Sequence, residues 1–507
     1  MSKNLTVTLL ASLIASASML SAAESPPGAT PPNVVADPPK FTHDWPGYNG
    51  PDGTFADQSR VPLLDDLSQA RLVWTSEQDD LGYGKTSSHG GHTYGPKSHP
   101  SGSCSLIVAG GRVIVTYFSP KNSVVADDVI LALDAATGKS VWKQVYAGKG
   151  FNRGAGKHPN YGPTPAAGDG KVFHLGTSGR VYAVDLATGK PLWESDVGDY
   201  PEHYRTVMAG VPVRADLDLM ASQIREPGRK AMRSTVCPLT VIDGVAMVPA
   251  DRLYAFETAT GKELWKLDGA SRVPSPAVIN GKTYALCSGA DQKMRLVEPK
   301  TGKVLWTEPI GISFNTTHGF IVADGKAFVP YKKVANVGHW DTAPLAAFAL
   351  SEIGPKLLWQ TKDEAHSETY FAYRDGVLYA NLPDKRVKAF KADDGTLLSD
   401  LDVSNSMSIH GHLHLWGDRL VLIGDDCHES LAHVCYYQSC TAGAKDLRLS
   451  GQALAPRTFK QYHGVGGYEC WMRPAFADGF MFTRSVNKET GQGAILCWDL
   501  RAQPAAR

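Results

Sequence analysis

One eleven-residue phrase recurs along this chain of 507 residues. The phrase Ala-x-Asp-x-x-Thr-Gly-x-x-x-Trp at residues 132–142 returns at 183–193, with Glu for Asp at 255–265, and in a looser form at 296–306. Repetition of this kind indicates one supersecondary unit stacked several times. The repeat therefore restricts the possible folds more than any single residue does.

The local structure of the phrase follows from its residue types. Apolar alternation over residues 129–134 predicts a half-buried strand, which resumes at residues 140–142 after a short break. In the break, Asp134 can bond to the backbone ahead of it, and Gly138 supplies a positive φ. We therefore expect an outer β-hairpin whose Trp142 lies across a neighbouring sheet, burying roughly 150 to 250 Å².

A second turn signal gives the number of units. Each unit carries a two-residue turn, flanked by alternating apolar residues, of a composition that favours hairpins with positive φ. These turns are Gly110-Gly111, Asp169-Gly170, Asp243-Gly244, Asn280-Gly281, Asp324-Gly325, Asp375-Gly376, Gly417-Asp418 and Asp478-Gly479. Their mean spacing of about 50 residues is typical of four-stranded propeller blades and is too long for the shorter solenoid repeats.

The two ends of the repeat region predict how the ring closes. Residues 71–75 resemble an outermost strand with its Trp74, but nothing upstream supplies the other three strands of a blade. The last unit, residues 474–500, supplies three strands. We therefore predict an all-β, eight-bladed β-propeller with four-stranded blades over residues 70–502, in which the N-terminal strand completes the last blade and leaves no open edge.

These motifs carry a family resemblance. The segments ALDAATGKSVW, AVDLATGKPLW, AFETATGKELW and LVEPKTGKVLW resemble the tryptophan-docking repeats of the pyrroloquinoline quinone (PQQ) propeller superfamily. That superfamily includes quinoprotein alcohol dehydrogenases and a non-enzymatic propeller that assists outer-membrane protein assembly. The resemblance is specific for the fold, and the scaffold motif is shared by catalytic and non-catalytic members.

Charge and terminal sequence set the expected environment. The 51 basic and 51 acidic side chains balance, so we expect neither nucleic acid nor an anionic membrane as a partner. Residues 1–23 resemble a cleaved signal peptide, with a transmembrane anchor as the alternative. Residues 24–69 form a Pro-rich leader that we expect to pack on the propeller through Trp45. The expected location is periplasmic or extracellular, with no transmembrane anchor after cleavage.

Export makes the cysteines informative. Cys427, Cys435, Cys440 and Cys470 lie in or beside a Cys-rich insertion at about residues 427–470, where the blade pattern of the seventh unit decays. We expect disulfides among these four, in one of three pairings that the sequence does not choose between. Nearby histidines allow a metal site as an alternative, and free thiols are the third.

Long connections are the candidate functional segments. The segments that join one blade to the next inner strand must converge on one mouth of the central channel, and those at 79–103, 146–163, 198–234 and 451–473 are unusually long. Histidines and charged residues gather in connections of this kind. The ligand-binding candidates are His89, His92, His158, His203, Arg205, His318, His366, Glu368, His410, His412 and His463. Such histidines could bind a metal or transfer protons, or they could simply bond to carbonyls on a solvated rim.

Two functions remain open from the sequence. The first is a binding or scaffold propeller whose long loops hold a protein, a glycan or a small molecule. The alternative is a dehydrogenase for alcohols or sugars that uses PQQ and calcium, which would require cationic donors, calcium-binding oxygens and an aromatic floor. The chain lacks the Cys-Cys pair and the Cys-x-x-Cys-His haem motif found in many of the catalytic relatives. The scaffold function is therefore favoured, and no catalytic residue or metal ligand is assigned.

Overall fold

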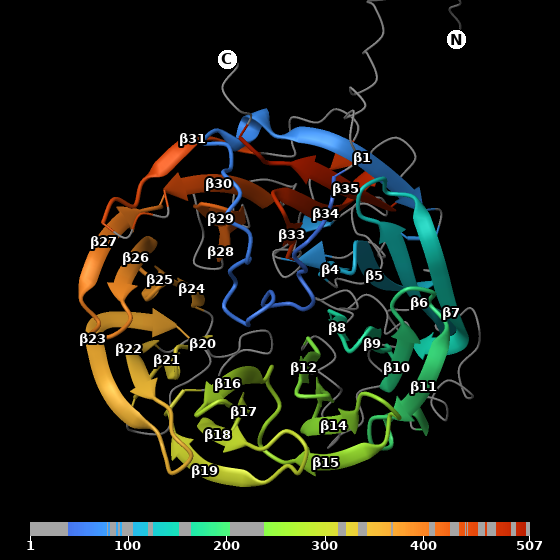
Figure 1. Ribbon diagram of the computed structural model, residues 1–507, viewed down its shortest axis with the longest axis horizontal. Coiled ribbons are helices and arrows are strands. Elements are labelled where there is room, and N and C mark those ends of the chain that lie inside the picture. The colour runs from blue at the N-terminus through green and yellow to red at the C-terminus, as the bar shows by residue number, and fades with distance from the viewer. Residues whose placement is uncertain are drawn as a thin grey trace, which may run out of the picture. The chain divides into compact units, whose positions relative to one another are not determined.

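The alternating apolar segments form strands, and the strands form a ring of antiparallel sheets (Figure 1). The computed structural model describes residues 39–78, 80–81, 88–89, 92–93, 105–119, 125–151, 164–202, 238–312, 321–332, 342–366, 369–404, 411–425, 435–441, 443, 445–454, 462–463, 473–487 and 493–502. Among these residues the sheets make eight blades of four strands each, which confirms the predicted all-β, eight-bladed propeller. No helix in these ranges has the length and apolarity to cross a membrane.

The first four blades follow the chain from the inner strand of each blade to its outer strand. Their bounds are β4 (Ile107–Ala109), β5 (Arg112–Ser119), β6 (Val125–Asp134) and β7 (Ser140–Phe151) in blade 1; β8 (Ala166–Gly168), β9 (Lys171–Leu175), β10 (Arg180–Asp185) and β11 (Pro191–Asp196) in blade 2; β12 (Thr240–Ile242), β13 (Val245–Pro249), β14 (Leu253–Glu257) and β15 (Glu263–Leu267) in blade 3; and β16 (Ser275–Ile279), β17 (Lys282–Ser288), β18 (Lys293–Val297) and β19 (Val304–Pro309) in blade 4.

Blades 5 to 7 repeat this order. Their bounds are β20 (Ile321–Ala323), β21 (Lys326–Pro330), β22 (Thr342–Ala349) and β23 (Lys356–His366) in blade 5; β24 (Tyr370–Arg374), β25 (Val377–Leu382), β26 (Arg386–Lys391) and β27 (Leu397–Asp402) in blade 6; and β28 (His412–Trp416), β29 (Arg419–Asp425), β30 (Cys435–Thr441) and β31 (Leu449–Leu454) in blade 7. Blade 7 is thus a complete blade, and two of its strands lie within the Cys-rich segment that we expected to be irregular.

Blade 8 is assembled from both ends of the propeller, as predicted. It contains β33 (Ala475–Ala477), β34 (Phe480–Asn487) and β35 (Gly493–Asp499), and β1 (Arg71–Gln78) pairs antiparallel with β35 as its fourth strand. The short strand β32 (Tyr462–His463) pairs with the far end of β34. The pairing of β1 with β35 covers the outer edge of β35 and joins the two ends of the ring.

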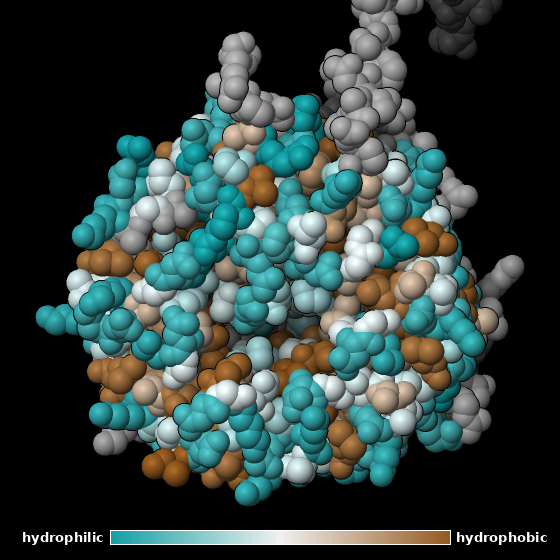
Figure 2. Space-filling model, in the orientation of Figure 1, coloured by the Kyte–Doolittle hydropathy of each residue, from teal (hydrophilic) through white to brown (hydrophobic). Residues whose placement is uncertain are grey.

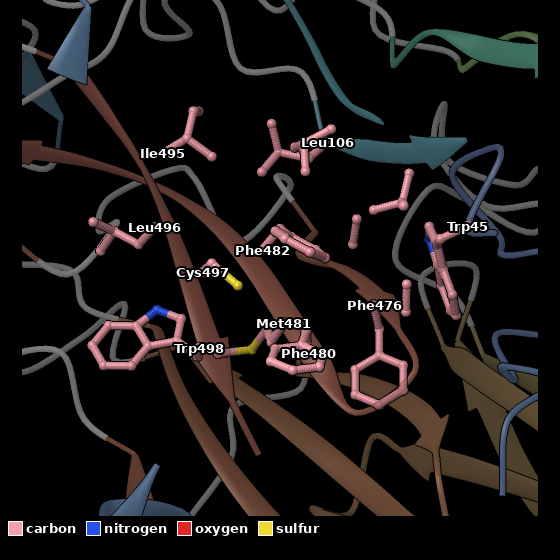
Figure 3. Close-up of a cluster of buried hydrophobic side chains, with 14 of the residues drawn as sticks. Trp45, Leu106, Phe476, Phe480, Met481, Phe482, Ile495, Leu496, Cys497 and Trp498 are labelled. Carbon is pink, nitrogen blue, oxygen red and sulfur yellow. The ribbon is translucent and has the colours of Figure 1, made fainter. Parts of the chain in front are cut away.

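A large hydrophobic cluster fills the region where the ring closes. Figure 3 shows Phe476, Phe480 and Phe482 beside Trp45 of the N-terminal segment, with Leu106 of the neighbouring blade close to them. Trp45 has only 1% of its surface exposed. Burial of large aromatic side chains stabilises the closed ring by roughly 1.5 to 3 kcal/mol for each ring buried.

The inner turns have the predicted backbone conformation. In seven of the eight turns both residues have positive φ, and in the Gly417-Asp418 turn only Gly417 does. Two-residue hairpin turns of this kind match the twist of the paired strands. Each turn joins the inner strand of a blade to the next strand, so all eight lie at the same end of the ring.

The repeated Trp joins one blade to the next. Its indole nitrogen donates to a backbone carbonyl in the outer turn of the following blade, and in every case except Trp306 its ring also covers the glycine of that turn. The donor and acceptor pairs are Trp74 with Ala135 (3.0 Å), Trp142 with Leu186 (3.0 Å), Trp193 with Thr258 (3.0 Å), Trp265 with Pro299 (2.6 Å), Trp306 with Ser351 (2.7 Å) and Trp359 with Ala392 (2.9 Å). These six bonds connect blade 8 to blade 1 and then each blade in order up to blade 6.

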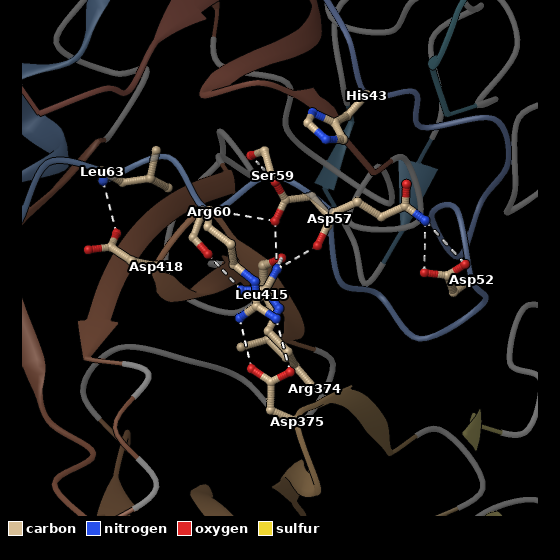
Figure 4. Close-up of polar contacts among 12 residues, drawn as sticks. His43, Asp52, Asp57, Ser59, Arg60, Leu63, Arg374, Asp375, Leu415 and Asp418 are labelled. Carbon is tan, nitrogen blue, oxygen red and sulfur yellow. Dashed lines mark hydrogen bonds and ion pairs between the residues drawn. The ribbon is translucent and has the colours of Figure 1, made fainter. Parts of the chain in front are cut away.

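The junctions between blades 6, 7 and 8 carry no such Trp in the described strands, and the N-terminal segment crosses them instead. At the first junction Asp57 accepts hydrogen bonds from Arg374 of blade 6 (2.6 Å) and from the backbone of Gly417 in blade 7 (2.9 Å), as Figure 4 shows. At the second junction Leu63 donates to Asp418 of blade 7 (2.9 Å), and the next residue bonds to blade 8. The 3-10 helix η1 (Leu67–Gln69) then leads into β1.

Candidate functional site

One end of the central channel is crossed by residues 42–57, which we name the axial plug (Figure 1). The plug hydrogen-bonds to inner turns and inner strands of several blades. Its contacts are Thr42 and His43 with Asp478, Asp44 with Gly110, Trp45 with Val108, Pro46 with Ala167, Thr54 with Tyr373, Phe55 with Leu415, and Asp57 with Gly417. Since three of these partners are inner-turn residues, the plug occupies the inner-turn face of the ring.

The surface in Figure 2 is polar in character. Hydrophilic side chains cover most of the face shown, and hydrophobic side chains lie scattered among them. A face of this composition gives little area for a purely hydrophobic docking site.

A ring of buried polar residues surrounds the channel at the end opposite the inner turns. Each lies at the first residue of an inner strand or within two residues before it. Its members among the described residues are Ser105, Thr164, Ser275, Thr369, His412 and Arg473, from blades 1, 2, 4, 6, 7 and 8. We name this set the polar collar. Buried polar side chains at equivalent positions of different blades indicate a feature that the hydrophobic core alone does not require.

Hydrogen bonds link the collar around blades 8, 1, 2 and 3. The backbone nitrogen of Arg473 donates to the Ser105 hydroxyl (2.8 Å), and the backbone nitrogen of Ser105 donates to the Thr164 hydroxyl (3.1 Å). The carbonyl of Thr164 accepts from Leu239 at the start of blade 3 (3.4 Å). These bonds fix the starts of four inner strands relative to one another, so the collar is a rigid support.

Arg473 is the one charged member of the described collar. Its side chain is enclosed by three aromatic rings, with the guanidinium carbon 4.2 Å from the ring centres of Tyr48 and Phe55 and 4.6 Å from that of Tyr370. Tyr48 and Phe55 belong to the axial plug, whereas Tyr370 begins β24. Arg473 therefore joins the plug to the collar.

Two histidines of β28 face this region. The ring of His412 lies 3.8 Å from that of Tyr370, and the ring of His414 stacks on Trp45 of the plug at 5.4 Å. Burial, together with the charge of Arg473, lowers the pKa of His414 well below its ordinary value. His414 is therefore neutral at physiological pH.

A second buried group lies between blades 1 and 2. Asp128 accepts hydrogen bonds from the backbone and hydroxyl of Thr177 (3.1 and 2.9 Å) and from the hydroxyl of Tyr182 (3.1 Å). Burial raises the pKa of Asp128 to about 6, even though the hydrogen bonds from Thr177 and Tyr182 act to lower it. No cation contacts this carboxyl in the described residues, so we assign it to the blade junction.

Of the sequence-predicted candidates, four have described positions besides His412. His89 and His92 are backbone partners in two short antiparallel strands, β2 (Ser88–His89) and β3 (His92–Thr93). His366 ends the outer strand β23, and His463 lies in β32 beside the end of β34. His158, His203, Arg205, His318, Glu368 and His410 lie outside the described residues.

The expectation that the histidines lie in connections is wrong for His366, and the further candidate His412 also lies in a strand. His366 is part of a ladder, paired with Thr342, because β23 continues for eleven residues. His412 is the first residue of an inner strand and is 1% exposed, because its neighbours in the ring are other inner strands. Sequence reasoning missed Arg473 and His414. The available signals were an Arg directly before a predicted inner strand and a His in the apolar alternation of β28.

The cysteines differ in part from the expectation. Cys440 is a free, fully buried thiol, because β30 directs it into the core between blades 6 and 7, and burial raises its pKa to about 12. Its predicted place in a disulfide is therefore wrong. Cys427 and Cys470 lie outside the described residues, and no side chain is described for Cys435, so pairing among these three stays a prediction.

The described residues fit only part of a quinone site. Arg473 and its aromatic neighbours suit an anionic, planar group. Calcium would require several carboxylate and amide oxygens, and the described residues contain no group of three or more His, Cys, Asp or Glu that could hold a metal. The described part of the collar therefore does not fit the complete cofactor, and no step of quinone chemistry is assigned to it.

The chain is similar to proteins of two kinds. A family model described as outer membrane protein assembly factor BamB matches residues 66–226 and 232–327, just over half of the chain. The quinoprotein alcohol dehydrogenase PedH of Pseudomonas putida is 26% identical over 268 residues, which are 49% of this chain and 40% of that protein. The outer membrane protein assembly factor BamB of Yersinia pestis is 21% identical over 381 residues, covering 72% of this chain and 78% of that protein.

Solved structures of both kinds are also similar. BamB from Moraxella catarrhalis gives a TM-score of 0.41 at 14% identity, covering 70% of this chain and 97% of that one. The quinohemoprotein alcohol dehydrogenase of Comamonas testosteroni gives a TM-score of 0.45 at 14% identity, covering 92% of this chain and 82% of that one. With its eight blades, its docked tryptophans and a family model that covers more than half of its length, the chain belongs to the PQQ-like repeat family of β-propellers.

Proposed function

We propose that this protein is an exported binding propeller that holds a protein partner on the face opposite the axial plug. The observation that carries the proposal is the plug itself. Residues 42–57 engage inner strands or inner turns of blades 8, 1, 2, 6 and 7, so the inner-turn face of the channel is already occupied by the chain. The strands that the long connections join end at the opposite face, and the scaffold itself does not require connections of that length.

One of the two relatives supports a protein partner. This relative is named an outer membrane protein assembly factor, and its match extends over 72% of this chain. Export is part of the proposal and is supported by the signal-like residues 1–23.

A quinoprotein dehydrogenase is the alternative function. It is favoured by the 26% identity to PedH over about half of this chain. Against it stand the absence of a Cys-Cys pair and of a Cys-x-x-Cys-His motif from the sequence, and the incomplete fit of the described collar to calcium. The first function predicts that the protein binds a protein partner, whereas the alternative predicts that it binds PQQ and calcium.

The partner is tested by photo-crosslinking in the source cells at two positions of blade 4. Ala290 is exposed between β17 and β18, on the proposed binding face, and Lys303 is exposed in the outer turn at the plug face. We expect a discrete crosslinked protein from a photoreactive residue at position 290 and none from position 303. Equal crosslinking at both positions, or none at 290 and at neighbouring positions of that face, would contradict the proposal.

The enzyme alternative is tested on the purified protein with PQQ and calcium. Equilibrium dialysis measures the binding of PQQ, and dye reduction with a panel of alcohols and sugars measures turnover. We expect neither stoichiometric PQQ binding nor turnover. Stoichiometric binding with substrate-dependent dye reduction would replace the scaffold function by a dehydrogenase.

A further inference from the structure

Arg473 has an environment that its structural role does not explain. Its side chain is 3% exposed, yet none of its three guanidinium nitrogens has a hydrogen-bond partner in the described part of the chain. Only its backbone nitrogen is bonded, to Ser105. A buried guanidinium presents five N–H donors, and each buried donor left without an acceptor destabilises the folded state.

The aromatic rings offset the charge of Arg473 but not its donors. The ring centres of Tyr48, Phe55 and Tyr370 lie 4.2 to 4.6 Å from the guanidinium carbon, a distance at which a desolvated cation is attracted to an aromatic ring. The N–H bonds of a guanidinium lie in its plane, and an aromatic ring offers them at most a weak acceptor. The three rings therefore do not replace hydrogen-bond acceptors for the donors of Arg473.

The surroundings of Arg473 lack a counter-charge. No ion pair of Arg473 with an acidic side chain occurs among the described residues, and His414 is neutral because burial, together with the charge of Arg473, lowers its pKa. The nitrogens of His414 and the side-chain oxygen of Asn49 are also buried without hydrogen-bond partners in the described residues. Asn49 belongs to the plug beside Tyr48. Unsatisfied polar atoms thus occur on both the plug and the collar.

We propose that Arg473 binds a small carboxylate at the junction of plug and collar. The planar fork of Arg matches the two oxygens of a carboxylate with two parallel hydrogen bonds, while Tyr48, Phe55 and Tyr370 keep the ion pair away from water. The site is distinct from the partner surface proposed above and does not depend on it. Because two of the three rings belong to the plug, the bound carboxylate also stabilises the plug in place.

The experiment measures protection of Arg473 from phenylglyoxal, with the modified peptide identified by mass spectrometry. The probes are acetate and succinate, compared with chloride and sulfate at the same ionic strength. We expect at least one carboxylate to slow modification of Arg473 at least tenfold, with chloride and sulfate giving less than twofold. Arg60 is the internal control, since its exposed pair with Asp375 should be equally reactive in all four salts.

Thermal unfolding gives a second readout on variants. The carboxylate that protects should raise the melting temperature of the wild type, because a ligand at 100 times its dissociation constant stabilises the folded state by about 2.7 kcal/mol. The increase should be lost in Arg473→Gln and weakened in Arg473→Lys, which keeps the charge but not the fork. Arg60→Gln should retain the full increase.

Three results would overturn the proposal. The first is no protection of Arg473 by either carboxylate. The second is equal protection by sulfate, which would show a general oxyanion site. The third is an unchanged increase in melting temperature in a folded Arg473→Gln variant. If that variant does not fold, the protection experiment on the wild type decides the question by itself.

Discussion

Replacement of Asp57 by Ala tests whether the N-terminal segment stabilises the junction of blades 6 and 7, where the described strands carry no docking Trp. Asp57 is 5% exposed, and the side chain of its partner Arg374 is 9% exposed. The carboxylate accepts from Arg374 at 2.6 Å and from Gly417 at 2.9 Å, and it also bonds to Ser59. The substitution removes all three bonds and leaves the charge of Arg374 buried in the junction of blades 6 and 7.

The expected loss of folding stability is large because the ion pair between Asp57 and Arg374 is buried. Removal of one partner from a buried ion pair costs about 3 to 5 kcal/mol, against about 5 to 15 kcal/mol for the whole stability of a typical protein. Arg374 keeps its bonds to the carbonyls of Gly417 (2.6 Å) and Leu415 (2.8 Å), which places the expected value near the lower end of that range. The control is Asp375→Asn, which breaks the exposed pair with Arg60 and should cost about 0.2 to 1 kcal/mol.

Urea unfolding followed by Trp fluorescence measures both variants, and limited proteolysis locates the change. Asp57→Ala should unfold at lower urea than Asp375→Asn and should be cleaved first within residues 39–66. The double variant Asp57→Ala with Arg374→Met should recover part of the loss, because no buried charge is then left unpaired. Equal stability of Asp57→Ala and Asp375→Asn within about 0.5 kcal/mol would refute the reasoning.

Three further predictions concern single residues. Burial raises the pKa of Asp128 from 3.8 to about 6 in the folded protein. The contribution of Asp128 to the free energy of unfolding is therefore fully present below pH 4 and falls by about 3 kcal/mol as the pH rises through 6. Asp128→Asn should remove this fall, and parallel profiles of stability against pH for wild type and variant would contradict the prediction. Gly261→Ala should destabilise the protein by about 2 to 4 kcal/mol in urea unfolding, because a Cβ there lies 2.5 Å from the ring of Trp193 and the residue has a φ of +75°; a neutral effect would show that the ring moves freely. Cys440 should not react with a thiol reagent until the protein unfolds, and rapid reaction of the native protein would place it outside the core.

The sequence predicted the fold because its signals are local. Turn residues such as Asp243-Gly244 require a particular φ, and the Thr-Gly-x-x-x-Trp phrase encodes both a hairpin and the contact to the next blade. Closure by β1 was also predictable, since residues 71–75 had no other partners. Blade 7 was harder, because β30 and β31 lack the Thr-Gly and Trp signals and are defined by pairing with β29.

The candidate site was only partly predictable because it is formed by distant segments. Arg473 becomes unusual only when Tyr48 and Tyr370, more than 300 residues apart in the chain, lie on either side of it. Among the described candidates of the histidine pattern, His412 lies at the start of an inner strand. The pattern could not distinguish His412 in a strand from a loop residue, because burial depends on the neighbouring blades.

The N-terminal segment links stability and binding in one structure. Asp57 holds the segment at the junction of blades 6 and 7, and Phe55, two residues earlier, lies against Arg473 of blade 8. A carboxylate bound at Arg473 would favour the docked segment, and by thermodynamic reciprocity the docked segment would favour the carboxylate to the same degree. A substitution at the junction of blades 6 and 7 would therefore alter the affinity of Arg473 for the carboxylate, although the substituted residue does not contact the ligand. The two junctions whose described strands carry no docking Trp are held by the N-terminal segment, so a carboxylate bound at Arg473 would influence closure of the ring there.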